Sequence, residues 1–184
     1  GMSNLGIRIL YGILNNLEGV CCERFFSVAL DMENILRAGG TDIFSLESRR
    51  RLNEFDLVGF SLGYELNYTN VLNILELGGI PLLSSERDCR YPLVIAGGPC
   101  VLNPEPMHEF FDLFVIGEAE EVISEIVDVY RRLKDKFKKA QISKDELLLE
   151  FSRTEGVYVP SLYDVSYTAS GVIEEFRPKA EGLP

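Results

Sequence analysis

Apolar runs that lack polar alternation are the clearest signal in this sequence. They predict β-strands over residues 56–62, 80–83, 93–96 and 113–116, with a shorter extended piece at 157–159. Residues 23–30 are also apolar and aromatic, which suits a strand or a strand-like connection. A strand without alternation is buried on both faces, as in a parallel sheet that helices cover on each side.

Helical spacing of apolar residues fills the intervals between these strands. The pattern predicts helices over residues 3–15, 32–38, 65–77, 118–134 and 145–152, and one more that opens at Pro104 or Glu105 and runs through Phe110. Ser3 or Asn4 is expected to cap the first helix, and Asp31 the second. Repeated strand–helix units predict an α/β fold with a doubly wound, mostly parallel sheet.

The C-terminal region follows a different pattern. Residues 163–168 and 172–176 alternate on either side of Ala169-Ser170-Gly171, which predicts an antiparallel hairpin with glycine in the turn. The expected organisation is one α/β domain over residues 2–135, followed by an extension of helix and hairpin over residues 136–184.

Glycine marks the ends of three predicted strands. The stretch Pro92-Leu-Val-Ile-Ala-Gly-Gly-Pro-Cys-Val-Leu-Asn-Pro104 is apolar up to Gly97 and Gly98, although glycine there costs backbone entropy on folding. Two interpretations stay open: a tight turn, or bare backbone that a ligand approaches. Ligands of open α/β sheets bind beyond the carboxyl ends of the strands. The corresponding ends of the other strands hold Ser61-Leu62-Gly63 and Gly117-Glu118.

Composition and charge narrow the function classes. The chain has 184 residues, of which 46% are hydrophobic and 26% charged, and its net charge of −11 disfavours a nucleic-acid partner. It contains no run of 18 apolar residues and no signal peptide, so no membrane partner is expected. None of the cysteines forms a Cys-x-x-Cys pair, and we interpret them as reduced, mostly buried thiols of a cytoplasmic protein; they are Cys21, Cys22, Cys89 and Cys100.

Nucleotide-binding motifs are missing from the sequence. There is no Gly-x-Gly-x-x-Gly and no Gly-x-x-x-x-Gly-Lys-Ser/Thr. The acids that follow Gly117, namely Glu118, Glu120 and Glu121, would repel phosphate and suit the start of a helix, where carboxylates interact favourably with the helix dipole.

Four blocks in order carry a resemblance to a known family: GMSNLGIRILYGILN, FSLESRRRLNEFDLVGFSLGYELNYTNVLNILELGGIPLL, PLVIAGGPCVLNPEPMHEFFDLFVIGEAEEVI and GVYVPSLY. Together, from about residue 2 to about residue 163, they resemble the N-terminal cobalamin-binding-like domain of large radical S-adenosylmethionine (SAM) proteins. The resemblance implies a flavodoxin-like domain with cobalamin on the carboxyl ends of its strands. The cofactor-binding residues it implies are Ser61, Leu62, Gly63, Gly97 and Gly98, joined by Pro99, Gly117 and Glu118 at the neighbouring strand ends.

The sequence departs from this family pattern at three points. The loop Met2–Gly6 keeps a glycine but lacks the histidine that would bind cobalt, and the only histidine, His108, lies elsewhere and is interpreted as a solvated helix residue. No Cys-x-x-x-Cys-x-x-Cys set is present, so the iron–sulfur cluster and SAM would belong to a domain outside this chain. The first strand of the sheet is missing, which predicts either a substitute strand, with the hairpin 163–176 as the candidate, or a homodimer along an open edge.

Three functions compete at this stage. The first is a module that positions a corrinoid for the radical SAM domain of the same full-length protein, with no catalytic residue and no metal ligand of its own. The second is a degenerate, cofactor-free domain that acts as an interaction scaffold or dimerisation module. A stand-alone hydrolase ranks last, because no Cys–His or Ser–His pairing occurs near a strand end. Tyr64, Asn67 and Tyr68 either reach the same crevice or simply pack at a helix start.

Overall fold

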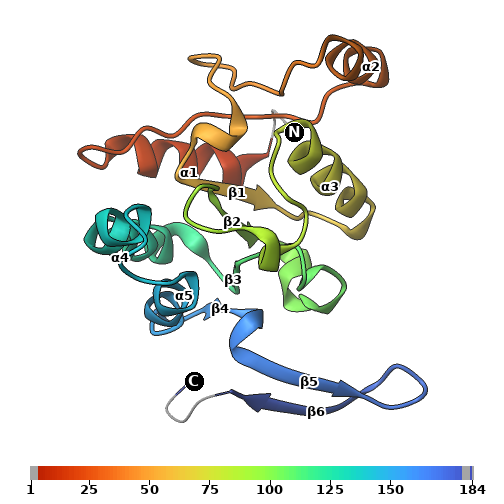
Figure 1. Ribbon diagram of the computed structural model, residues 1–184, viewed down its shortest axis with the longest axis vertical. Helices are drawn as coiled ribbons and strands as arrows, with labels where there is room; N and C mark the ends of the chain where they lie inside the picture. Colours follow the sequence, from red (N-terminus) through yellow and green to blue (C-terminus); the bar gives the residue numbers. More distant parts are fainter. Residues whose placement is uncertain (1–3, 180–182, 184) are drawn as a thin grey trace.

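A four-stranded sheet forms the centre of the computed structural model, which describes residues 4–179 and 183. Strands β1 (Leu57–Ser61), β2 (Leu93–Gly97) and β3 (Leu113–Val115) are parallel, and β4 (Val157–Tyr158) pairs antiparallel with β3. The spatial order is β1-β2-β3-β4 (Figure 1). The predicted α/β class, with a mostly parallel sheet of flavodoxin-like type, is confirmed.

Helices cover the sheet on both faces. Five α-helices are described: α1 (Leu5–Asn16), α2 (Leu30–Gly39), α3 (Tyr68–Leu77), α4 (Ala119–Lys138) and α5 (Lys144–Phe151). In β2, Val94 and Ala96 join one buried cluster together with α3, whereas Leu93 and Ile95 join a second cluster together with α4 and α5. Successive side chains of one strand therefore enter two cores, which explains why the apolar run shows no alternation.

Capping residues near the helix ends agree with the sequence-based expectations in α1 but not in α2. The Asn4 side chain accepts a hydrogen bond from the Ile7 amide at 3.1 Å, as expected for the first helix. Ser143 and Glu146 form a capping box at the start of α5. The prediction that Asp31 caps α2 is wrong: α2 begins at Leu30, and Asp31 lies in its first turn, where a carboxylate still favours the helix dipole.

Two predicted elements differ in the structure, and a third, at residues 23–30, takes the connection form that the sequence left open beside a strand. Residues 80–83 form a loop instead of a strand, because the carbonyls of Pro81 and Leu82 accept hydrogen bonds from the Arg87 side chain instead of a neighbouring strand. Residues 23–29 are an extended connection without ladder pairing. The helix expected from residue 104 to 110 is reduced to one short 3₁₀ turn, Glu105–Met107.

The predicted hairpin is confirmed, but it does not replace a missing strand. Strands β5 (Tyr163–Tyr167) and β6 (Ile173–Pro178) pair with each other in a separate two-stranded sheet. No segment within residues 4–179 pairs with the outer edge of β1, so the hypothesis that the hairpin fills this edge is wrong. A homodimer along the edge stays a prediction.

A row of aromatic rings connects the hairpin to the core. Phe111 lies 5.9 Å from Phe60 and 5.2 Å from Phe114 between ring centroids, and Phe114 leads on to Tyr158 at 6.1 Å. Tyr158 in turn contacts the rings of Tyr163 and Phe176 at the base of the hairpin.

The predicted domain boundary at residue 135 lies inside α4 and remains a prediction.

A buried carboxylate joins the segments on which this architecture depends. Asp112, directly before β3, accepts hydrogen bonds from the Val94 amide and the Ser84 hydroxyl, both at 2.6 Å. Its carboxylate also forms ion pairs with Arg87, at 3.2 Å, and with Lys144, at 2.5 Å. Burial lowers the pKa of Lys144, because loss of hydration outweighs the attraction of Asp112. The cluster links the entry of two strands to the start of α5.

Replacing this carboxylate should be costly. Asp112→Asn keeps the shape but leaves the buried positive charges of Arg87 and Lys144 without their partner, so we expect a loss of about 3–5 kcal/mol in the free energy of unfolding. Urea unfolding followed by circular dichroism measures the loss. The matched control is Asp88→Asn, which removes only an exposed ion pair with Arg90 and should change stability little. Equal effects of the two variants would contradict the role given to Asp112.

Candidate functional site

A hollow of about 260 Å³ lies at the carboxyl ends of β2 and β3. It is lined by Gly98, Pro99, Leu102 and Gly117. The two strands run parallel with Ile95 opposite Leu113, so their ends and the loops that follow meet at one edge of the sheet. This edge is where open α/β sheets bind ligands. Of the cofactor-binding residues predicted from the sequence, Gly98, Pro99 and Gly117 therefore lie together at this edge.

The segments that follow β1 and β2 are hydrogen-bonded to each other. The Leu62 amide donates to the Gly97 carbonyl at 2.7 Å, and the Cys100 amide donates to the Leu62 carbonyl at 3.1 Å. A Cβ on Gly98 would lie 2.9 Å from the Leu62 carbonyl oxygen, and Gly98 has φ +100°. The tight-turn interpretation is thus the right one for Gly98, because only glycine permits this backbone crossing.

Unlike Gly98, Gly97 and Gly117 have open space where a side chain would lie. A Cβ on either residue would meet no atom within 4 Å, and Gly117 has φ +106°. Bare backbone with open space beside it is what the ligand interpretation requires. The geometry thus supports the turn interpretation at Gly98, whereas at Gly97 and Gly117 the ligand interpretation stays a prediction.

The remaining predicted residues lie around the hollow and do not line it. The Leu62 side chain is buried in the core, whereas Ser61 and Gly63 are exposed beside it. Glu118 occupies the N-cap position of α4 without a side-chain capping bond, and acids follow it in the first turn. These carboxylates suit the helix dipole and do not point to a ligand.

Exposed apolar side chains surround this edge, and sequence reasoning missed most of them. Tyr64 and Leu66 follow β1, Leu102 follows β2 and Ile116 follows β3, with Leu66 and Leu102 more than three-quarters exposed. Large apolar residues in short loops at three successive strand ends were the signal that could have revealed them. We call these four residues the apolar rim, because each is a large exposed apolar side chain beyond the carboxyl end of a strand. Tyr68 instead packs against the core, as a helix-start residue does.

No metal ligands gather in the described part of the chain. No group of three or more His, Cys, Asp or Glu side chains within residues 4–179 could hold a metal ion. The His108 ring nitrogen Nδ1 lies 2.7 Å from the Glu105 carbonyl oxygen, away from the residues that line the hollow. The four cysteines are free thiols, as predicted, but the expectation that most are buried is wrong: Cys21 is exposed and the other three are only partly buried. Partial burial raises the pKa of Cys22 to about 11.

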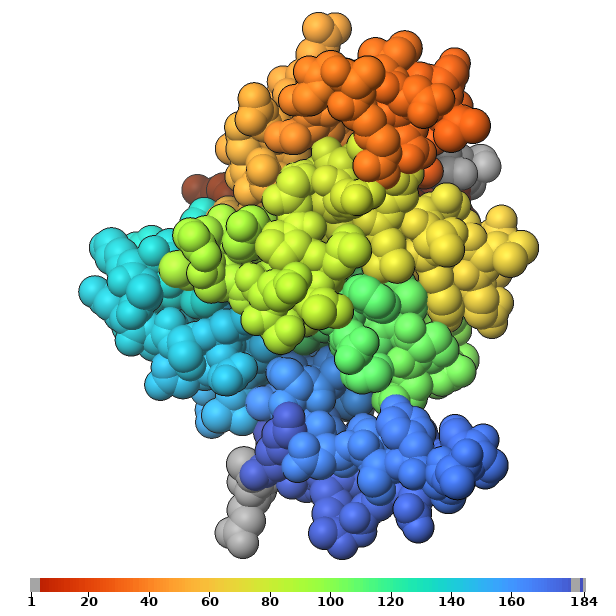
Figure 2. Space-filling model, turned by 45° about the vertical axis from the view of Figure 1, so that its right-hand side comes forward, coloured from red at the N-terminus to blue at the C-terminus, as the bar shows by residue number. Residues whose placement is uncertain are grey.

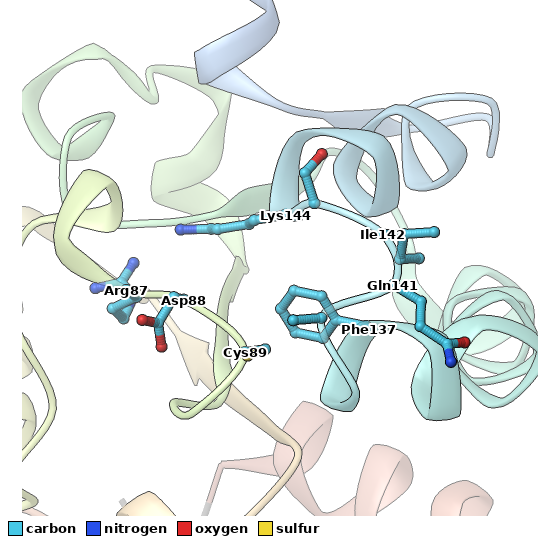
Figure 3. A pocket seen from close by; sticks show the side chains of 9 residues that line it. Arg87, Asp88, Cys89, Phe137, Gln141, Ile142 and Lys144 are labelled. Atoms are coloured by element: carbon cyan, nitrogen blue, oxygen red, sulfur yellow. The ribbon is translucent and has the colours of Figure 1, made fainter.

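A second hollow, of about 310 Å³, lies beside the start of α5 (Figure 3). Arg87 and Lys144 line one side of it, with Cys89 and Phe137 close by. Arg87 donates to Asp112 and to the carbonyls of Pro81, Leu82 and Phe110, and Lys144 is bonded to Asp112 and Ser84. These cations are already engaged, so this hollow is a structural feature and not a candidate site.

Comparison with known proteins places the chain in a broader context. A family model described as "Radical SAM proteins, N-terminal" matches residues 6–160. An uncharacterized protein of Methanocaldococcus jannaschii is 28% identical over 142 residues, a match that covers 72% of this chain and 30% of that protein. The chain thus spans less than a third of the length of this relative. No solved structure matches it. Among the described helices, none has both the length and the apolar character needed to cross a bilayer.

Substitution of the two adjacent glycines should separate their roles. Gly98→Ala forces a side chain into a positive-φ position against the Leu62 backbone, and we expect it to destabilise the fold by about 2–4 kcal/mol. Gly97→Ala is the matched control, since its Cβ enters open space, and it should change stability by less than about 1 kcal/mol. Urea unfolding of both variants makes the comparison. If both substitutions are tolerated equally, the backbone crossing does not require glycine.

Proposed function

This chain belongs to the radical SAM protein N-terminal family, and from that membership we propose that it is an accessory module that presents the carboxyl edge of its sheet to a corrinoid. The catalytic domain, with its iron–sulfur cluster and SAM, lies in this proposal on another part of the same polypeptide. The module itself supplies position and surface and does no chemistry of its own.

The open backbone at Gly97 and Gly117, inside the apolar rim, is the observation that supports this proposal most. A corrinoid is flat and bulky, and one of its faces can lie on a sheet edge where the backbone is bare and no side chain projects. The hollow of about 260 Å³ falls below the roughly 300–1,000 Å³ typical of pockets that enclose a ligand. We therefore propose that the corrin ring rests on the carboxyl edge of the sheet and that one of its substituents occupies the hollow.

The residues present do not fit a corrinoid whose cobalt is bound by a protein histidine. None of the residues that line the hollow is a histidine. The place where a nucleotide tail would insert, between Ser61-Leu62-Gly63 and Gly97-Gly98, is closed by direct backbone hydrogen bonds. Cobalt would thus receive no ligand from these residues.

The closed slot favours a second candidate function, a cofactor-free interaction module. In that case the apolar rim contacts protein and no cofactor is held. Both functions use the same edge of the sheet, and they differ in whether a free corrinoid binds to it.

Titration with hydroxocobalamin separates the two functions. If the first holds, the visible spectrum changes on binding, and Leu102→Asp weakens binding by about tenfold or more because it places a charge on the apolar rim. Leu30→Asp is the matched control, since Leu30 is exposed to a similar degree on α2 and should leave binding unchanged. Absence of any spectral change and of retained colour at high micromolar concentrations would remove the corrinoid function.

A further inference from the structure

The C-terminal hairpin has one apolar and one polar face. Cross-strand pairing sets Val165 opposite Phe176 and Tyr167 opposite Ile173, so these side chains share a face. The other face carries charged and hydroxyl groups, including Asp164 opposite Arg177 and Ser166 opposite Glu175. This binary pattern is typical of a sheet that buries one side against another structure.

The apolar face is buried only at the base of the hairpin. There Tyr163 stacks on Phe176 with ring centroids 4.6 Å apart, and both rings contact Tyr158. Phe176 is nevertheless 49% exposed, and farther along the hairpin Tyr167 is 44%, Ile173 47% and Val172, next to the turn, 62% exposed. Figure 1 shows that the hairpin projects beyond the sheet, and Figure 2 shows it as a separate lobe at one end of the molecule. Several large apolar side chains thus lie unburied on a projecting element.

The hairpin is nevertheless held in a fixed place. The Lys179 amide donates to the Leu162 carbonyl at 2.9 Å at its base, and the Tyr167 hydroxyl donates to the Glu105 carboxylate nearer its turn. An isolated two-stranded hairpin is marginally stable in water, so these anchors preorganise it. A preorganised apolar surface loses little conformational entropy when it binds a partner.

We propose that this face, whose exposed side chains are Tyr167, Ile173 and Phe176, docks the catalytic domain of the same polypeptide. The inference rests on the proposed function, in that the chain must be a module of a longer radical SAM protein. It adds the surface through which the module and the catalytic domain are held together.

The choice of occupant follows from the comparisons and from charge. The family match ends at residue 160, directly before the hairpin, and describes an N-terminal region, so the polypeptide that follows the module would emerge from β6. About 70% of the length of the M. jannaschii relative lies outside the match. A second copy is a poorer fit, because the chain carries a net charge of −11 and two copies would therefore repel each other.

Hydrogen–deuterium exchange tests the docking. The exchange of peptides from residues 163–178 is compared between the full-length protein and this 184-residue chain. We expect slowing of about tenfold or more in the full-length protein, since burial of the hairpin suppresses local opening. Ile173→Asp, or the milder Ile173→Ser if the first variant folds poorly, should abolish the slowing in the full-length protein, whereas Leu30→Asp on α2 should preserve it.

The outcomes distinguish this proposal from the others. Equal exchange of the hairpin in both proteins would overturn it. Slowing in the 184-residue chain that grows with protein concentration, with a dimer seen by light scattering, would also overturn it in favour of a second copy. Loss of hydroxocobalamin binding has no bearing on the hairpin result, so the docking surface and the corrinoid function can fail separately.

Discussion

The buried carboxylate of Asp112 is the interaction on which the rest of the structure depends. It receives hydrogen bonds from the backbone of β2 and from Ser84, and it neutralises the largely buried cations of Arg87 and Lys144. Arg87 then uses its other N–H groups to hold three loop carbonyls. A charged cluster of this kind is tolerated in a core because every donor has a partner. It fixes how β2 and β3 enter the sheet.

The Asp112 cluster fixes the amino ends of β2 and β3, and this also determines the position of their carboxyl ends. Because β2 and β3 are short and buried on both faces, fixing their entry also fixes where Gly97 and Gly117 emerge. Beyond β2, the crossing of Gly98 against Leu62 closes one side of the edge, while Gly97 and Gly117 keep the other side open. The candidate site is thus a consequence of core packing at the opposite end of the sheet.

Periodicity predicted the elements that bury apolar residues and failed where side chains compete for backbone groups. Strands such as 93–97 and helices such as α4 follow from their apolar positions alone. Residues 80–83 are equally apolar, but the carbonyls of Pro81 and Leu82 accept hydrogen bonds from the Arg87 side chain. The pattern of apolar residues does not predict this contact. The site shows the same limit: glycine positions were evident, yet which glycine packs and which stays open depends on tertiary contacts.

The outer edge of β1 and helix α1 are both left partly uncovered within the described part of the chain. No residue of α1 is buried although the helix is rich in Leu and Ile, and a side chain at Gly59 of β1 would meet open space. An apolar helix above a bare strand edge lacks the neighbour that would cover both. The hairpin does not cover this edge, because it forms a separate sheet whose apolar face contacts Tyr158. The edge of β1 and the apolar face of the hairpin are therefore two separate open surfaces of the described part of the chain.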